Sequence, residues 1–458
     1  MRKVLALLAV LLVACGAAYL YAGRLPGPTI AITHPDRLVG VVTPVDLSVT
    51  SPGGTLTSLH LFFDQGGKAT ELASLAAGDT AALAHDGPDT LKISKVISRD
   101  TVPGLASGPA QIRVEATRPV LFGLRQASVV VQKALQVRLE RPSLSVISTH
   151  HYINVGGAEM VVYRVTPTDV ASGVSVGDRE YPGFPAAGAT VGDIHLTDPG
   201  LRVAFFALLW DDPLSTRIHL YARDDAGNST QATVEYKVFP KAPKRSTIDL
   251  DDRYLDRVVP AIEAGSPEVK ASGSLITQFL VLNGDLRRKN AATIAAFASR
   301  TSPEMLWRGD TFYRYANTKT ESAFADQRTY LYQGRVVDHQ THLGFDLASF
   351  AHTPVKAANR GKVLYAADLG IYGNCVIIDH GMGVQSLYAH LSSIEVPVGS
   401  MVDKAQELGK SGETGMAGGD HLHFTMLVNG QMVNPLEWWD PHWIQDRIIR
   451  KLREASSR

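Results

Sequence analysis

Three short stretches in the last third of the chain decide how that part must fold. Residues 341–346 read Thr-His-Leu-Gly-Phe-Asp, residues 388–391 read Tyr-Ala-His-Leu, and residues 420–424 read Asp-His-Leu-His-Phe. Two imidazoles and one carboxylate are enough for a zinc site with an open fourth position, which is the catalytic rather than the structural arrangement. Two further histidines would remain to move protons. The stretches therefore indicate an enzyme rather than a metal-binding module.

The spacing within these stretches constrains the backbone. His421 and His423 lie in an apolar, β-prone run, and on a strand they would point to the same face about 6.6 Å apart. That distance suits one histidine on a metal and the other over a substrate. His342 and Asp346 would lie about 13 Å apart on a flat strand. We therefore expect a bend at Gly344 to bring them together.

The same stretches, with others between them, resemble the lysostaphin-like (LytM-type) zinc metalloendopeptidases of bacterial peptidoglycan. The resemblance covers about residues 331–440. Its further ordered matches are Thr-Pro-Val at 353–355, Tyr-Gly-Asn at 372–374, Ile-Asp-His-Gly at 378–381, Val-Gly at 398–399 and Ser-Gly-Glu-Thr-Gly at 411–415. So many matches in order make the resemblance specific.

The resemblance implies one Zn²⁺ per catalytic domain and hydrolysis of the peptides that cross-link peptidoglycan. By the matched positions, the zinc ligands are His342, Asp346 and His423, and the catalytic histidines are His390 and His421. No His-Glu-x-x-His helix is present, so a histidine must replace the usual glutamate base.

One neighbour of the motifs departs from the family pattern, and others lack a role in it. Asp420 stands where the family more often has proline. The Asp420 carboxylate could hydrogen-bond a histidine or cap a turn, and we expect it to cap a turn. The resemblance gives His339, His352 and His380 no ligand role, and His380 is expected at a turn ending a strand.

Composition indicates a folded protein of about three domains. The chain has 458 residues, of which 45% are hydrophobic and 20% charged. Lys+Arg and Asp+Glu both number 45, so the overall charge indicates no nucleic-acid partner. Its two cysteines, Cys15 and Cys375, lie in separate apolar segments and predict no disulfide.

The N-terminus predicts export. In the predicted segment 1–26, two cations precede an apolar run at residues 4–22, long enough at about 1.5 Å per residue to span a membrane core of about 30 Å. We expect a single-pass anchor in the inner membrane with the body on the extracytoplasmic, periplasmic side. The alternatives are a lipoprotein acylated at Cys15, because residues 12–15 resemble a lipobox, and secretion after signal cleavage.

The fold class expected is mainly β. Short alternating apolar stretches predict two immunoglobulin-like β-sandwich domains, at 27–138 and 139–240. They would act as spacers, or else bind the wall or envelope proteins. A mixed connector with helices is expected at 241–330, including helices near 251–264 and 289–300, and it could pack on the catalytic domain or cover its groove.

The C-terminal part is expected to hold an antiparallel β metallopeptidase domain at 331–440 and an amphipathic helix at 441–458. Asn429-Gly430 predicts a hairpin turn. Ile444, Ile448 and Leu452 share one helical face, which favours docking over membrane binding. The function expected is a zinc-dependent peptidoglycan endopeptidase. The alternatives are a non-catalytic envelope scaffold that activates a separate hydrolase and a zinc peptidase acting on envelope proteins.

Overall fold

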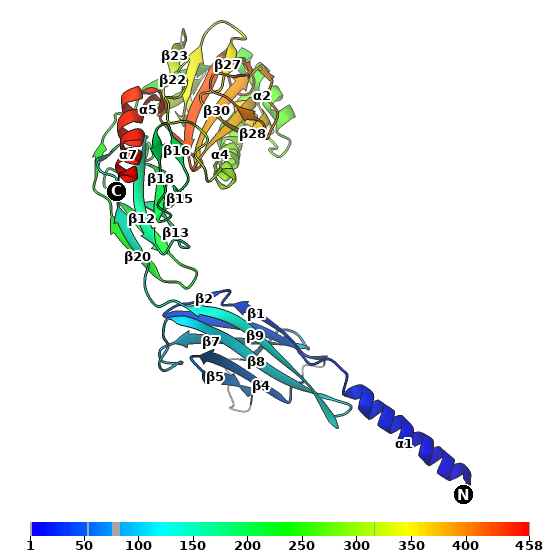
Figure 1. The fold of residues 1–458 in the computed structure, drawn as a ribbon. Coiled ribbons are helices and arrows are strands. Elements are labelled where there is room, and N and C mark those ends of the chain that lie inside the picture. The colour runs from blue at the N-terminus through cyan, green and yellow to red at the C-terminus, as the bar shows by residue number, and fades with distance from the viewer. Residues whose placement is uncertain (1, 53–54, 76–82, 316, 458) are drawn as a thin grey trace. The chain divides into compact units, whose positions relative to one another are not determined.

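The structure is a computed structural model that describes residues 2–52, 55–75, 83–315 and 317–457. The chain forms two compact units (Figure 1). Unit 1 comprises Met1–Pro142 with Arg223–Thr230, and unit 2 comprises Ser143–Ala222 with Gln231–Arg458. Most elements are strands, so the predicted mainly β class is confirmed. The predicted domain boundaries stay predictions.

Unit 1 begins with the helix α1 (Arg2–Ala22). Across the described residues, we find no helix whose length and apolar character would let it cross a membrane. The single-pass anchor expected for residues 4–22 stays a prediction.

The rest of unit 1 is a β-sandwich. One sheet has the order β1 (Thr29–His34), β3 (Val42–Thr50), β7 (Thr90–Ser98) and β6 (Leu83–His85). The other has the order β2 (Leu38–Val39), β9 (Arg125–Val137), β8 (Gly108–Val120), β4 (Ser58–Gln65) and β5 (Lys68–Ser74). Alternate residues of β3 and β4 point into one core, in which Leu47 and Phe63 are buried. The immunoglobulin-like assignment stays a prediction here and in the next domain.

The first part of unit 2 is also built from sheets. One has the order β10 (Ser143–Val146), β12 (Ala158–Thr166), β18 (Leu201–Ala207) and β15 (Phe184–Pro185). Another has the order β14 (Arg179–Pro182), β13 (Ala171–Val176), β19 (Ile218–Arg223) and β20 (Ser229–Thr233). Two pairs complete it, β11 (His151–Asn154) with β21 (Tyr236–Phe239) and β16 (Thr190–Val191) with β17 (Ile194–His195).

Helices follow the strand β22 (Arg245–Leu250). They are α2 (Asp252–Gly265), α3 (Leu275–Val281) and α4 (Arg287–Ala296), with a π-turn at Leu282–Leu286 and a 3₁₀ turn at Phe297–Arg300. The helices predicted near 251–264 and 289–300 are confirmed. Asp251 caps α2 by accepting from the N–H of Tyr254, and the helix continues through Pro260 because its apolar stripe is buried.

The C-terminal part of unit 2 is an antiparallel sheet, as predicted. Its order is β23 (Lys319–Ser322), β26 (Phe345–Ala348), β34 (Leu422–Val428), β30 (Val384–Leu391), β29 (Asn374–Gly381), β28 (Gly361–Asp368) and β32 (Met401–Val402), and β35 (Gln431–Val433) also pairs with β34. The turn at Asn429-Gly430 joins β34 to β35, and both residues have positive φ, which confirms the predicted hairpin. Every residue of β34 is buried.

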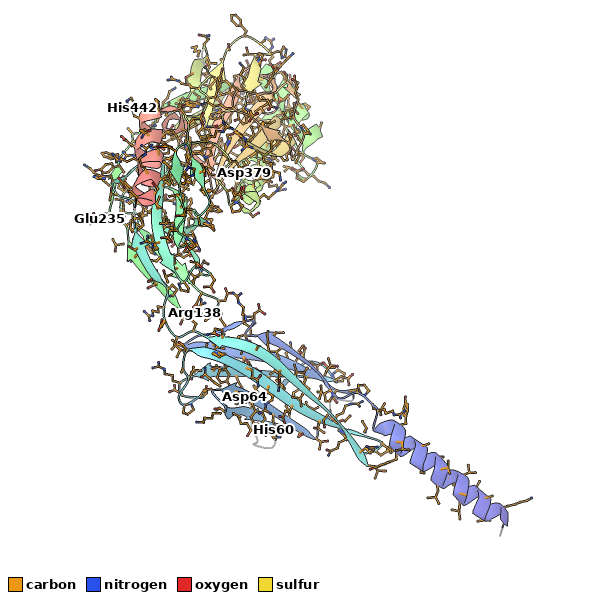
Figure 2. All side chains as sticks on the ribbon, viewed as in Figure 1. His60, Asp64, Arg138, Glu235, Asp379 and His442 are labelled. Carbon is orange, nitrogen blue, oxygen red and sulfur yellow. The ribbon has the colours of Figure 1, made fainter. Side chains whose placement is uncertain are left out.

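Two smaller sheets flank this one. One comprises β22, β24 (Asp326–Tyr332) and β25 (Arg335–His342), and the other comprises β27 (Pro354–Lys356), β33 (Glu407–Lys410) and β31 (Ser393–Ile394). Asp379 on β29 is buried and accepts hydrogen bonds from the Thr301 hydroxyl and the Ser302 N–H, both at 2.7 Å (Figure 2). This carboxylate ties the end of the helical connector to the sheet.

The chain ends in short helical segments that dock on the strands of unit 2. They are α5 (Pro435–Trp439), α6 (Pro441–Ile444), a π-turn at Gln445–Ile449 and α7 (Arg450–Ser456). Ile444, Ile448 and Leu452 are buried, which confirms the predicted docking face, although the π-turn interrupts the single helix that we expected. The buried Lys451 Nζ lies 2.7 Å from the carboxylate of Glu159 on β12.

The docked end contains a second buried carboxyl group. Glu437 on α5 accepts hydrogen bonds from the Asn154 side chain and from the N–H of Ala158, both at 2.7 Å. Burial nevertheless raises the pKa of Glu437 to about 7, from 4.5 in an exposed chain. Between these pH values the folded state binds more protons than the unfolded state, so this group's contribution to the free energy of unfolding falls as pH rises.

We predict that Glu437→Gln removes this pH dependence. The difference in free energy of unfolding between wild type and variant should change by about 3 kcal/mol from pH 4.5 to 7. Denaturant unfolding followed by tryptophan fluorescence measures it, because all five tryptophans lie in unit 2. The control, Glu413→Gln at an exposed position, should show a constant difference. A constant difference for Glu437→Gln would contradict the prediction.

Candidate active site

Three side chains from two separate stretches of chain meet at one point inside unit 2. His342 ends β25, Asp346 lies on β26, and His423 lies on β34, where it pairs directly opposite Asp346. The His342 Nε2 lies 2.9 Å from Asp346 Oδ1, and His423 Nδ1 lies 3.0 Å from each of these atoms. All three residues are buried, and they form the one candidate metal group of this kind among the described residues.

The donor set fits a zinc ion. The Nδ1–H of His342 donates to the carbonyl of Ala323 at 3.1 Å, so in the neutral ring Nε2 carries only a lone pair. That lone pair faces a carboxylate oxygen, which is repulsive unless a cation lies between them. Zinc bonds of about 2.0–2.1 Å in a tetrahedron separate the ligand atoms by about 3.3 Å, close to the spacing observed.

A bend at Gly344 brings His342 and Asp346 together, as expected from their spacing. β25 ends at His342 and β26 begins at Phe345, with the bend between them. A Cβ atom on Gly344 would lie 2.5 Å from the His423 ring. Glycine is therefore required here for close approach to a ligand ring.

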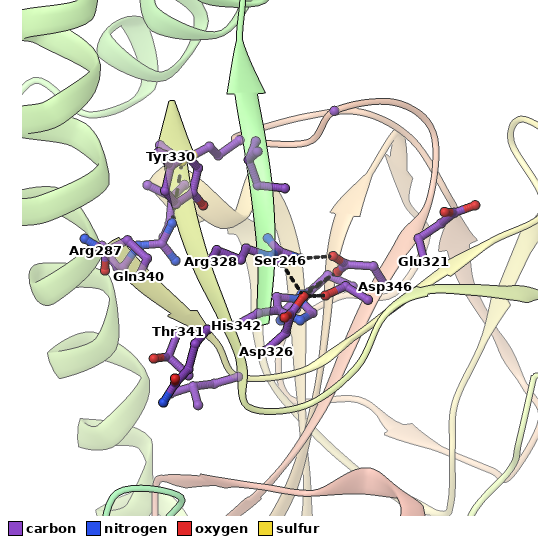
Figure 3. A pocket seen from close by; sticks show the side chains of 18 of the residues that line it. Ser246, Arg287, Glu321, Asp326, Arg328, Tyr330, Gln340, Thr341, His342 and Asp346 are labelled. Carbon is purple, nitrogen blue, oxygen red and sulfur yellow. Dashed lines mark hydrogen bonds and ion pairs between the residues drawn. The ribbon is translucent and has the colours of Figure 1, made fainter. Parts of the chain in front are cut away.

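Arg328 holds the outer oxygen of the Asp346 carboxylate. Its guanidinium donates to Asp346 Oδ2 at 2.7 Å, while Oδ1 faces the two ligand nitrogens (Figure 3). Both side chains are mostly buried, at 20% and 11% exposure. Such outer partners fix the orientation of a ligand and tune its affinity for metal. No sequence motif marked Arg328, because it lies on β24, before the matched stretches begin.

The two remaining histidines of the motifs lie beside the metal group. The ring centroids of His390 and His421 are 4.9 Å apart, and His421 Nε2 lies 3.4 Å from Asp346 Oδ1. The Nδ1–H of His390 donates to the Thr414 carbonyl and that of His421 to the Gly419 carbonyl, both at 2.8 Å. The neutral His390 ring therefore keeps Nε2 as an acceptor, whereas Nε2 of His421 faces the Asp346 carboxylate.

The backbone at His390 is unusual. The pairing of β29 with β30 shifts register between Val376 and Asn374, so the strand bulges next to His390, whose φ is +61°. A bulge redirects a side chain, and strained backbone of this kind is concentrated at functional sites.

Burial and the charges of neighbouring side chains shift the pKa values of His390, His421 and Asp346 in different directions. Burial and the neighbouring His421 and His423 hold the pKa of His390 well below its usual range. Burial also lowers the pKa of His421, but the Asp346 carboxylate outweighs it and raises that pKa above the ordinary value. Burial raises the pKa of Asp346, yet the surrounding histidines hold it well below its usual range.

All five predicted site residues line one pocket of about 1380 Å³. The predicted connector forms much of its wall: β22 and β24 lie along it, and Tyr254 of α2 and Arg287 of α4 contribute side chains (Figure 3). Ser246 on β22 donates to Asp326 on β24 at 2.8 Å, which fastens the two strands beside the site. The connector therefore packs on the sheet and helps to shape the pocket.

The other residues singled out lie outside the metal group. Asp420 accepts from the His352 N–H and the Ser411 hydroxyl, so it ties two other segments together; the expected turn cap stays a prediction. His339 and His352 are exposed. His380 lies one residue before the end of β29 and is a strand residue rather than the expected turn residue. Its buried imidazole bonds to Ser386 and to the Arg360 carbonyl.

Taken together, the antiparallel sheet and the buried His/Asp/His group define a β domain with a candidate metal site. Residues 340–435 match Peptidase family M23. The chain thus carries a peptidase M23 domain, and the resemblance to lysostaphin-like, LytM-type proteins is confirmed.

The chain spans well under half the length of the curated relatives it matches. The DD-carboxypeptidase/endopeptidase Mpg of Neisseria meningitidis is 42% identical over 95 residues, which is 21% of this chain and 22% of that protein. The peptidoglycan DD-endopeptidase ShyA of Vibrio cholerae is 31% identical over 178 residues, 38% of each chain. The solved catalytic domain of lysostaphin from Staphylococcus simulans is 29% identical, covering 27% of this chain and 92% of that one, with a TM-score of 0.24.

We predict that Arg328→Met weakens zinc binding by about 10- to 100-fold, because Asp346 loses its outer partner. Isothermal titration of zinc into metal-stripped full-length protein measures this. Arg335→Met, at an exposed position on the neighbouring strand, is the matched control and should bind as wild type does. Unchanged affinity in Arg328→Met would show that the guanidinium does not support the ligand.

Proposed function

We propose that the protein is a zinc-dependent endopeptidase that hydrolyses the peptide cross-links of peptidoglycan during cell-wall remodelling. The observation that carries the proposal is the convergence of His342, Asp346 and His423 beside His390 and His421 in one pocket. The membership of residues 340–435 in Peptidase family M23 supports it, as do relatives named for cutting peptidoglycan.

His342, Asp346 and His423 would hold the zinc. When bound there, the ion supplies a Lewis acid for the scissile carbonyl and lowers the pKa of water. His390 and His421 have their Nδ1 protons fixed on backbone carbonyls, so each presents Nε2 to the pocket. One can take the proton of the attacking water, and the other can donate to the developing oxyanion or to the leaving amine.

The assignment of roles follows the surroundings of each ring. His390 is deeply buried and lacks a carboxylate partner of its own, which suits a neutral base. His421 lies 3.4 Å from Asp346 Oδ1, which favours its charged form and suits a hydrogen-bond donor to the oxyanion. The pocket wall also carries Arg245, Arg287 and Arg288, which can receive the free carboxylates of stem peptides.

The location and the remaining domains are part of the same proposal. We propose that the N-terminal segment associates with the inner membrane and holds the body on the periplasmic side. The two β domains would then act as immunoglobulin-like spacers that raise the peptidase toward the wall.

Digestion of purified sacculi by the full-length protein tests the proposed activity. We expect release of uncross-linked muropeptides, its loss on chelation, and its return on addition of zinc. Stimulation of an added amidase without release would favour the scaffold function. Cleavage of envelope proteins but not of sacculi would favour a different substrate.

Two substitutions test the roles within the site. His423→Ala should lose zinc and activity together, whereas His390→Ala should keep zinc and lose about 10²- to 10⁴-fold in turnover. Metal content by mass spectrometry and sacculus digestion give the two measurements. His442→Ala, at an exposed position that does not line the pocket, should keep both. Equal zinc loss in His423→Ala and His390→Ala would show that the roles are assigned wrongly.

A further inference from the structure

The β8–β9 hairpin of unit 1 ends in an exposed apolar loop. Val120 pairs with Arg125, and the four residues between them, the hairpin tip, read Leu121-Phe122-Gly123-Leu124. Phe122 is fully exposed and Leu124 is 72% exposed. Hairpin loops usually carry glycine, asparagine, aspartate or serine, so two exposed large apolar side chains at this place require a reason.

The backbone of the hairpin tip presents these side chains outward. Leu121, Phe122 and Gly123 have φ values of 50°, 56° and 86°. The left-handed region is unfavourable for leucine and phenylalanine. The turn therefore adopts a strained conformation without burying Phe122 in the core of unit 1.

The hairpin tip lies beside the end of α1. Ala22 and Leu25 pack against Val120, Ala127 and Leu121 in a small apolar cluster. The rest of α1 carries exposed apolar side chains, among them Leu11, Leu12, Val13 and Leu20.

Two arginines of the hairpin fasten it to the last turns of α1 and to the chain just after the helix. The Arg125 guanidinium donates to the Tyr19 carbonyl at 2.9 Å and lies 4.5 Å from the centre of the Tyr19 ring. Arg118 donates to the Pro26 carbonyl at 3.0 Å. The hairpin tip and the helix end are therefore held as one piece.

We infer that the hairpin tip inserts into the surface of a phospholipid bilayer beside α1. Phe122 and Leu124 would enter the boundary between head groups and acyl chains. Arg24, which is exposed, would face anionic head groups, and the tyrosines at the end of α1 have the amphipathic character of membrane-interface residues. The inference rests on the proposed membrane association of the N-terminal segment. It adds a second point of attachment, which would fix the orientation of the unit 1 sandwich on the membrane.

Site-specific fluorescence on the full-length chain tests this inference. In a Cys15→Ser background the remaining Cys375 is buried, so a single introduced cysteine can be labelled with the environment-sensitive probe NBD. The positions are Phe122→Cys at the hairpin tip, Leu12→Cys in α1, and Val130→Cys on the exposed side of β9 as the matched control. The proteins are reconstituted into vesicles of phosphatidylcholine and phosphatidylglycerol, with or without spin-labelled lipid.

We expect the emission of the probes at positions 122 and 12 to shift to shorter wavelength and to be quenched by spin-labelled lipid. The probe at position 130 should keep the emission maximum that it has in aqueous solution. Quenching at 12 with a water-like signal at 122 would overturn the inference and leave the proposed association intact. Water-like signals at both positions would overturn both. Quenching at 122 alone would support the hairpin tip as a membrane contact and overturn the role of α1. Equal quenching at 122 and 130 would overturn a specific role of the tip.

Discussion

The candidate site depends on holding two imidazole nitrogens and one carboxylate oxygen about 3 Å apart in the interior of a β-sheet. Antiparallel pairing of β26 with β34 fixes Asp346 opposite His423, and pairing of β34 with β30 fixes Ala389, the residue before His390, opposite the same histidine. A buried carboxylate facing imidazole lone pairs is costly without a cation. The sheet therefore holds the three side chains in an arrangement that a bound metal ion would stabilise. A core formed by apolar packing alone would not bring them together.

The residues around this group fix the orientation of its side chains. Backbone carbonyls of Ala323, Thr414 and Gly419 each take one imidazole proton, so three rings have their tautomers set by the main chain. Arg328 takes the carboxylate oxygen that faces away from the ligand nitrogens. Because Arg328 and part of the pocket wall come from residues before 340, the site is larger than the region matched by the family. The connector strands thus form part of the wall of the candidate site.

Features that depend on a few neighbouring residues could be predicted from the sequence. The bend at Gly344 followed from the reach of a strand, the hairpin at Asn429-Gly430 from turn chemistry, and the helix at α2 from its apolar period. Arg328 could not be predicted, because a lone arginine on an alternating strand gives no sign of its partner 18 residues away. The buried His380 was missed for the same reason: its partners Ser386 and Arg360 are set by strand pairing. The π-turn at Gln445–Ile449 has no local signature that we could use.

Diffraction at the zinc absorption edge, from crystals of the zinc-loaded full-length protein, tests the central claim most directly. We predict one anomalous peak per chain, about 2.0–2.2 Å from His342 Nε2, Asp346 Oδ1 and His423 Nδ1, with its fourth side open to the pocket. A peak held by other side chains, or no peak between these three residues, would contradict it.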